Sequence, residues 1–183
     1  MGTAGMSAPE YHGKKVAITG AAGAYGRDLA AAFHRCGANL LLSDDQASCA
    51  STLPHGSWRY LRADLSTAAG TDALADWLLA DGVPDVLVNN AGLFPFVDLL
   101  ATPLDCFDAI LGVNLRAPFR LMQRIGAAMA QRGAGAICNI SSGAASVVRE
   151  NGAVYGASKA ALEQLTRAFA VRLVFCPGNI STK

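Results

Sequence analysis

The pentapeptide YGASK places a tyrosine and a lysine at a spacing that could support proton transfer. On a helix, Tyr155 and Lys159 lie one turn apart and share a face. A tyrosine is a poor base at neutral pH because its unperturbed pKa is about 10, and an ammonium group one turn away would stabilise the phenolate. The pattern is short, however, and an exposed helix pair without any chemical role is the alternative interpretation.

Two further polar residues could act with this pair. Ser142 belongs to the segment NISSG and precedes Tyr155 by 13 residues. Asn114 precedes Pro118 by four residues. Because proline has no N–H, the main-chain carbonyl of Asn114 lacks its normal helical partner. That carbonyl is either part of a tolerated kink or free to bind a water molecule or a charged group.

The segment TGAAGAYG contains three glycines at a predicted strand-to-helix turn, namely Gly20, Gly23 and Gly26. Glycine lets the main chain turn sharply and approach a pyrophosphate, which the N-terminus of the following helix stabilises. The G-x-x-G-x-x-G spacing differs from the commoner dinucleotide fingerprint. By itself, the segment is therefore either a dinucleotide-binding loop or an ordinary turn.

Acidic and small residues follow other predicted strands. Asp44 lies 24 residues after Gly20, where a carboxylate can accept hydrogen bonds from an adenosine ribose. The same carboxylate would repel a 2′-phosphate, which favours NAD over NADP. Alternatively, Asp44 or Asp45 only caps a turn. The segments ADLS (63–66) and NNAG (89–92) place small or polar residues after two more strands, in line with the glycine loop.

These residues fall between elements that the hydrophobic pattern predicts. Short apolar runs indicate strands, and longer runs with helical spacing separate them. The predicted strands are 15–19, 39–43, 58–61, 85–90, 136–140 and 172–176. The longest predicted helix covers about 103–131, with Thr102 as its N-cap, Pro103 at its first position and Gly133 after its end.

Strands that alternate with helices predict an α/β fold. We expect a doubly wound parallel sheet with helices on both faces, in three layers. One domain should cover residues 14–183, preceded by a flexible lead-in over residues 1–13. Ligands of such sheets bind beyond the carboxyl ends of the strands. The glycine loop and the polar residues named above follow strands, so they should meet at one edge of the sheet.

Composition and charge argue against several other classes of protein. A net charge of +1 provides no basic surface for nucleic acid. The five cysteines show no paired spacing, which favours free thiols in a reducing compartment, and the three histidines form no metal-ligand pair. No apolar run approaches the length of a membrane span. We therefore expect a cytoplasmic protein that binds no nucleic acid, membrane or metal.

Taken together, the glycine loop, the acidic strand end, NNAG, Asn114, Ser142 and YGASK resemble the short-chain dehydrogenase/reductase family, and CPGNIST (176–182) resembles its PG segment. The resemblance covers about residues 14–182. It implies hydride transfer between a nicotinamide cofactor and a small-molecule secondary alcohol or ketone, and a Rossmann-like fold. Tyr155 would be the general acid/base, Lys159 would assist it and hold the nicotinamide ribose, Ser142 would bind the substrate oxygen, and Asn114 would hold a water molecule.

The resemblance also implies which residues contact the cofactor, expected to be NAD. They are Gly20, Gly23, Tyr25, Gly26, Asp44, Asp64, Leu65, Asn90, Ala91, Gly92, Tyr155, Lys159, Pro177, Gly178 and Ile180. A homodimer or homotetramer is expected, through helix faces that include Phe119, Met122, Leu162 and Leu165. The segments 92–96 and 143–154 would line a largely apolar pocket, which suits a cyclic alcohol, a steroid-like molecule or a 3-oxoacyl chain.

Two features depart from the family pattern. Ala24 stands where the usual TGxxxGxG loop has a glycine. The chain between Lys159 and Pro177 is also shorter than usual, so we expect residues to be missing near 170–172, and the substrate-covering segment to be missing after Lys183. The alternative function is therefore a non-catalytic or truncated cofactor-binding member of the same fold.

Overall fold

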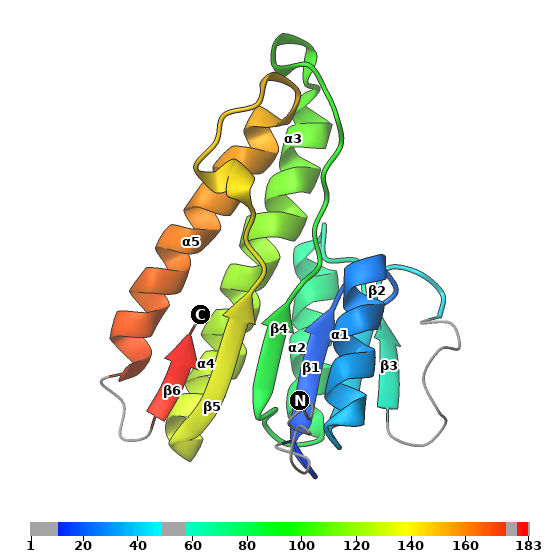
Figure 1. Cartoon of the computed structure of the whole chain (residues 1–183), viewed down its shortest axis with the longest axis vertical. Coiled ribbons are helices and arrows are strands. Elements are labelled where there is room, and N and C mark those ends of the chain that lie inside the picture. The colour runs from blue at the N-terminus through cyan, green and yellow to red at the C-terminus, as the bar shows by residue number, and fades with distance from the viewer. Residues whose placement is uncertain (1–10, 49–57, 175–178, 183) are drawn as a thin grey trace, which may run out of the picture.

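The computed structural model describes residues 11–48, 58–174 and 179–182. Its strands are β1 (Lys15–Thr19), β2 (Asn39–Asp44), β3 (Trp58–Arg62), β4 (Val86–Asn89), β5 (Ala134–Asn139) and β6 (Asn179–Thr182). They form one sheet in the order β3-β2-β1-β4-β5-β6, and every neighbouring pair is parallel (Figure 1). The predicted doubly wound sheet is confirmed, and its strand order reverses between β1 and β4.

Alternate residues of the central strands pack on opposite faces of the sheet. Val16 and Ile18 of β1 contact the core beneath helix α1 (Ala24–Arg35). Ala17, between them, contacts the larger core, to which three helices contribute: α2 (Ala68–Ala80), α4 (Ala117–Arg132) and α5 (Ala153–Val174). Because both faces of β1 are covered, its successive residues are apolar, as the pattern predicted.

The chain between β4 and β5 forms two α-helices joined by a π-helical turn, and not the single helix predicted over 103–131. The helices are α3 (Leu104–Leu111) and α4, and the π-turn is η2 (Gly112–Arg116). The N–H of Ala117 bonds to the carbonyl of Gly112, five residues earlier. The next residue is Pro118, which has no N–H for a regular helical bond, so a π-turn at this point is a physically reasonable outcome.

The start of α3 also differs from the prediction, whereas the end of α4 agrees with it. Pro103 has an extended main chain, with ψ of 148°, and occupies the N-cap position that was predicted for Thr102. The hydroxyl of Thr102 donates instead to the carbonyl of Asp98 at 2.8 Å, around the 3₁₀ turn η1 (Leu99–Ala101). Gly133 follows α4 with a left-handed φ of 75°, as expected of a helix stop.

Helix α5 continues into the segment predicted to be a strand at 172–176. Residues up to Val174 are helical, and the sixth strand is β6. Residues 175 and 176 lie outside the described residues. The prediction was wrong because Leu162, Phe169 and Leu173 recur at helical spacing and pack against one core. Leu173 fits against Gly126 of α4, where a Cβ would lie 3.4 Å from the leucine Cδ1.

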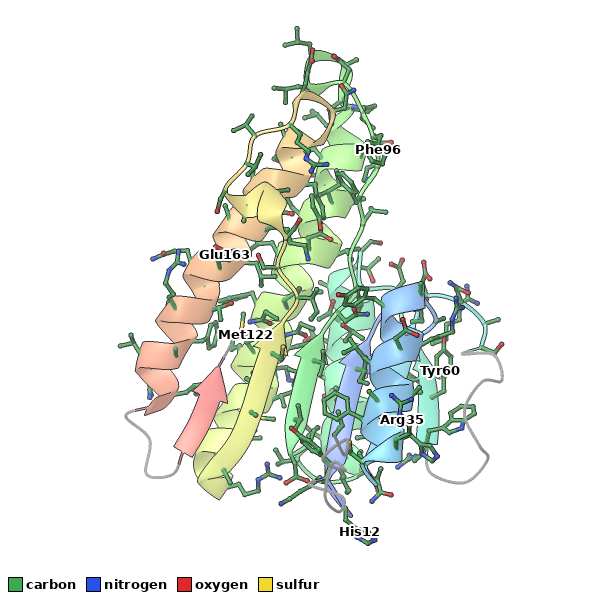
Figure 2. All side chains as sticks on the ribbon, viewed as in Figure 1. His12, Arg35, Tyr60, Phe96, Met122 and Glu163 are labelled. Carbon is green, nitrogen blue, oxygen red and sulfur yellow. The ribbon has the colours of Figure 1, made fainter. Side chains whose placement is uncertain are left out.

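Two of the four residues expected at an oligomer interface are buried. Met122 of α4, labelled in Figure 2, has an exposed fraction of 0%, and Leu162 of α5 has one of 1%, so neither can contact a second copy. Phe119 remains exposed and Leu165 is half-buried. Within the described residues, the helices include none with the length and apolar character needed to cross a membrane.

Candidate active site

The glycine loop packs directly against the segment that follows β4. Gly20 has a left-handed φ of 66°, and a Cβ there would lie 2.7 Å from the Cα of Ala91. Gly26, in the first turn of α1, faces the carbonyl of Gly20 so closely that any side chain would collide with it. These two positions therefore require glycine, and their close packing leaves the N-terminus of α1 open beside the loop.

Asn90 and Thr19 hold this loop in place. The Asn90 side-chain nitrogen donates to the carbonyls of Thr19 and Gly20 at 2.9 and 3.0 Å. The Thr19 hydroxyl accepts hydrogen bonds from the main-chain N–H groups of Asn90 and Ala91 at 3.1 and 3.0 Å. The side chain of Asn90 is thus engaged by the protein itself. Sequence reasoning missed Thr19, although its place at the end of β1 could have indicated it.

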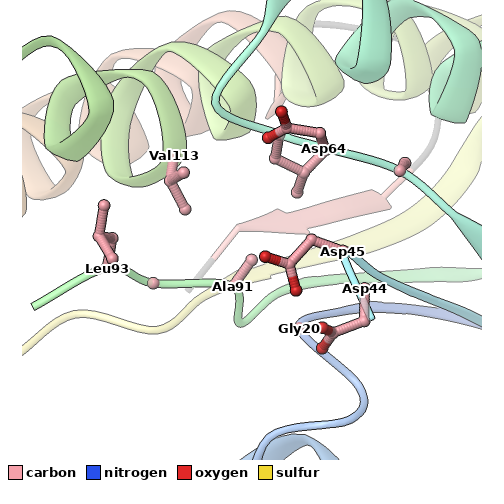
Figure 3. A pocket seen from close by; sticks show the side chains of 10 residues that line it. Gly20, Asp44, Asp45, Asp64, Ala91, Leu93 and Val113 are labelled. Atoms are coloured by element: carbon pink, nitrogen blue, oxygen red, sulfur yellow. The ribbon is translucent and has the colours of Figure 1, made fainter. Parts of the chain in front are cut away.

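A pocket opens beyond the carboxyl ends of β1, β2, β3 and β4. Its lining residues are Gly20, Asp44, Asp45, Ala63, Asp64, Leu65, Ala91, Gly92, Leu93 and Val113. Figure 3 shows three carboxylate side chains toward one end of the pocket and Leu93 and Val113 toward the other. The pocket is therefore acidic at one end and apolar at the other.

Hydrogen bonds determine the charge state of the acidic end. Asp44 accepts a hydrogen bond from the N–H of Ala22, in the glycine loop, at 2.9 Å. The hydrogen bond between the carboxyl groups of Asp45 and Asp44, together with burial, raises the pKa of Asp45. Hydrogen bonds from Ser66 lower the pKa of Asp64, and the Ser66 N–H lies 2.9 Å from that carboxylate. Asp64 thus carries its negative charge at neutral pH.

Asn114 connects the π-turn to the segment after β4 and to α5. Its side-chain oxygen accepts from the N–H of Leu93 at 2.8 Å, and its side-chain nitrogen donates to the Leu93 carbonyl at 2.9 Å and to the Ser158 hydroxyl at 3.1 Å. Ser158 in turn donates to the carbonyl of Tyr155 at 2.6 Å. Asn114 is completely buried. The amide therefore couples the position of residue 93 to the helix that carries Tyr155.

Beyond the carboxyl end of β5, the loop that carries Ser142 packs on the helix that carries Tyr155 and Lys159. Ser142 accepts a hydrogen bond from the N–H of Ala144 at 3.2 Å and begins the 3₁₀ turn η3 (Gly143–Ala145). This turn packs on α5 at Gly156, where a Cβ would lie 2.7 Å from the Ala144 carbonyl oxygen. The glycine of YGASK thus allows the loop that carries Ser142 to approach the helix that carries Tyr155.

Lys159 is buried beside Tyr155. Its ammonium donates to the carbonyl of Ile140 at 2.7 Å and lies 5.7 Å from the centre of the Tyr155 ring. It also lies close to Gly92, where a Cβ would be 3.8 Å from Nζ. Burial lowers the pKa of Lys159, so the ammonium loses a proton more easily than an exposed lysine does.

The structure brings most of the expected site residues together, but not all of them. Gly20, Asp44, Asp64, Leu65, Ala91 and Gly92 line the pocket, and Gly23 is the N-cap of α1. Tyr25 is mostly exposed on α1 and does not line the pocket.

Of the last three residues expected to contact the cofactor, Ile180 is the one that the structure describes, and it does not join this group. Ile180 pairs with Gly135 near the amino end of β5, whereas Ser142 follows the carboxyl end of that strand. The position of Ile180 therefore does not support the prediction that it contacts the cofactor. The reason is that β6 follows the PG segment, whereas a strand was predicted before it. Pro177 and Gly178 lie outside the described residues.

The chain is similar in sequence to known proteins over most of its length. The family model described as short chain dehydrogenase matches residues 14–182. The chain is 35% identical to the "Probable oxidoreductase EphD" of Mycobacterium tuberculosis, over 91% of this chain and 31% of that protein. It is 34% identical to the D-threitol dehydrogenase of Mycolicibacterium smegmatis, over 80% of this chain and 59% of that protein.

A solved structure shares the fold closely. The gluconate 5-dehydrogenase from Burkholderia cenocepacia J2315, in complex with NADP and tartrate, matches with a TM-score of 0.83 and 30% identity, covering 93% of this chain and 69% of that chain. The chain spans less than two thirds of the length of the two curated relatives named above.

Proposed function

Because the chain belongs to the short-chain dehydrogenase family, we propose that it transfers a hydride between a nicotinamide cofactor and a secondary alcohol or its ketone. The proposal rests on the buried side chains around Tyr155, which are those of Asn114, Ser158 and Lys159. Lys159 lies over its ring, and Asn114 and Ser158 connect its helix to the pocket. Asn114 follows β4, whereas Tyr155, Ser158 and Lys159 belong to α5, which follows β5, so only the folded chain assembles them.

The residues of the pocket fit a dinucleotide. Gly20 and Gly26 leave no side chain between the loop and the N-terminus of α1, which is a favourable position for a pyrophosphate. Asp44 and Asp64 are at the end that suits an adenosine, and Gly92 leaves room beside Lys159. When bound, the nicotinamide ring supplies or accepts the hydride.

The protein's own groups would handle the proton. In the direction of reduction, the carbonyl carbon gains the hydride and its oxygen gains the proton of the Tyr155 hydroxyl, so that an alcohol and the oxidised cofactor result. Lys159 would stabilise the phenolate that remains until a proton returns from solvent. Ser142 would orient the substrate oxygen through its hydroxyl. We also propose that the main-chain carbonyl of Asn114 binds a water molecule.

We further propose that NAD is preferred over NADP. Asp44, Asp45 and Asp64 all line the pocket, and a 2′-phosphate beside them would bring like charges together. Asp44→Asn tests this, because the amide oxygen still accepts from the Ala22 N–H while the charge is removed. The parent should bind NADH at least about tenfold more tightly than NADPH, and Asp44→Asn should narrow that ratio. Asp28→Asn, on the exposed surface of α1, is the control.

Turnover tests the central proposal. Nicotinamide absorbance should report oxidation of NADH with members of a panel of ketones. Tyr155→Phe should reduce the rate by about 100-fold or more, because general acid catalysis is lost. Tyr11→Phe, which removes a hydroxyl from a residue packed on Phe33, should retain the rate. Tight binding of NADH with no turnover of any ketone would contradict the proposal and support a non-catalytic cofactor-binding protein.

A further inference from the structure

Three aromatic rings form a row that ends at the proposed catalytic tyrosine. The ring centres of Phe96 and Phe94 are 4.6 Å apart, and those of Phe94 and Tyr155 are 4.3 Å apart. Phe94 and Phe96 belong to the segment after β4, whereas Tyr155 belongs to α5. Figure 2 shows Phe96 on this segment, beside α3 and away from the sheet. Phe94 therefore contacts the residue that would exchange the proton.

The position of Phe94 is determined from two sides. Asn114 binds both main-chain polar groups of Leu93, the residue immediately before it. On the other side, Gly152 provides space for the ring, since a Cβ there would lie 3.1 Å from Cε2 of Phe94. Gly152 belongs to the 3₁₀ turn η4 (Glu150–Gly152), which leads into α5. The ring is thus placed from one side by the side chain of Asn114, which acts through Leu93, and from the other by the lack of a side chain at Gly152.

The surroundings of this row are apolar. Phe94 is 37% exposed and Phe96 is 76% exposed, so both rings offer surface to a ligand. A small hollow next to Tyr155 is lined by Pro95, Val97, Leu99, Thr102, Ile110, Gly152, Ala153 and Val154. Tyr155 itself also lines this hollow; apart from it, Thr102 is the single polar side chain among the lining residues, and its hydroxyl already donates to the carbonyl of Asp98. Against the exposed rings of Phe94 and Phe96, a polyol would leave hydroxyl groups without partners, whereas an aromatic ring would find stacking surfaces.

We propose that Phe94 determines substrate choice, and that the site prefers ketones and alcohols with a flat apolar ring next to the reacting carbon over open-chain polyols. This inference rests on the proposed function, since it concerns the substrate that would reach Tyr155. It separates this chain from relatives whose names specify polyols, such as the D-threitol dehydrogenase. It also assigns Gly152 a purpose, which is to admit the ring of Phe94.

The test compares two ketones, acetophenone and the ketotetrose erythrulose, with NADH as the reductant. The readout is the ratio of kcat/KM for acetophenone to kcat/KM for erythrulose, so that a general loss of activity cancels. The parent should favour acetophenone. Phe94→Ala should lower the ratio by about tenfold or more, whereas Phe94→Trp, which retains an aromatic ring, should preserve most of it.

Two further variants serve as a control and as a second perturbation of the Phe94 ring. Phe119→Ala is the matched control, because Phe119 is 39% exposed and contacts another aromatic ring, that of Phe169 of α5, with 5.9 Å between the ring centres. It should leave the ratio unchanged. Gly152→Ala should displace the ring of Phe94 without removing it, and should lower the ratio in the same direction as Phe94→Ala. It serves as the second variant if Phe94→Ala does not fold.

A binding measurement distinguishes failure of this inference from failure of the proposed function. Saturation-transfer NMR with acetophenone, recorded without cofactor, should show transfer to the phenyl protons in the parent and in Phe119→Ala, and much less in Phe94→Ala. If the parent reduces ketones but Phe94→Ala and Phe119→Ala give the same ratio, the inference is wrong and the function stands. If no ketone is reduced, the proposed function is wrong, and the NMR comparison alone decides the inference: transfer that depends on Phe94 supports it, and equal transfer in all variants overturns it.

Discussion

Replacing Asn114 by alanine should destabilise the protein by about 2–4 kcal/mol. The side chain makes three buried hydrogen bonds, two to the main chain of Leu93 and one to the Ser158 hydroxyl. Each contributes about 1 kcal/mol net, and a buried N–H or carbonyl left without a partner adds a further penalty. Alanine offers neither a donor nor an acceptor, and no solvent reaches the site, since Asn114 is 0% exposed.

Urea unfolding followed by circular dichroism measures this change. For a domain of this size the thermal midpoint should also fall, by about 5–15 °C. Asn39→Ala is the matched control: it removes the same groups from an exposed side chain whose bond to the Gly13 carbonyl is long, at 3.4 Å. It should cost less than about 0.5 kcal/mol. If the two variants are equally stable, the buried amide does not hold residue 93 as described.

Three more predictions concern the loop, a helix contact and a thiol. Gly26→Ala should abolish NADH binding in a fluorescence titration, because its Cβ would collide with the Gly20 carbonyl. Asp72→Asn should lower the thermal midpoint at about pH 7 and progressively less in acid: the hydrogen bond from Arg120 lowers the pKa of Asp72, so its stabilising contribution is lost as the pH falls through that lowered value. Iodoacetamide at about pH 8 should modify Cys138 more slowly than Cys36, by peptide mass spectrometry, because burial raises the pKa of the Cys138 thiol.

Each of these has its own control. Gly143→Ala, outside the glycine loop, places a methyl group in open space, so NADH binding should survive; equal loss in both glycine variants would refute the steric argument. If the thermal midpoint of Asp72→Asn lies as far below that of the parent at about pH 3 as at about pH 7, the ion pair is not the cause of the difference. Both cysteines should react alike in urea, where Cys138 is no longer buried by the fold.

Local spacing explains why part of the site could be predicted from sequence. Tyr155 and Lys159 share a helix face whatever surrounds them, and Gly20 and Gly26 belong to one short turn. The parallel, doubly wound sheet followed from the alternation of strands and helices together with the handedness of crossovers. These inferences needed only residues that are close in the chain, or rules that hold for every parallel sheet.

Contacts between distant segments were beyond the sequence pattern. Phe94 reaches Tyr155, and Asn114 reaches Leu93, only because α5 and the π-turn pack beside the segment after β4. The strand predicted at 172–176 failed for a related reason. A short apolar run such as Leu173 and its neighbours fits a strand or a buried helix equally well, and packing against Gly126 decides between them.

The amide of Asn114 has a consequence for engineering. In Leu93 it binds only the main-chain N–H and carbonyl, so these two hydrogen bonds would form with almost any side chain at position 93. The side chains at 94 and 96 project from a backbone that is anchored independently of them. Libraries that vary these two positions could therefore explore new specificities while the anchoring amide and Tyr155 stay in place. The residue that anchors the main chain, Asn114, is thus separate from the residue proposed to select the substrate, Phe94.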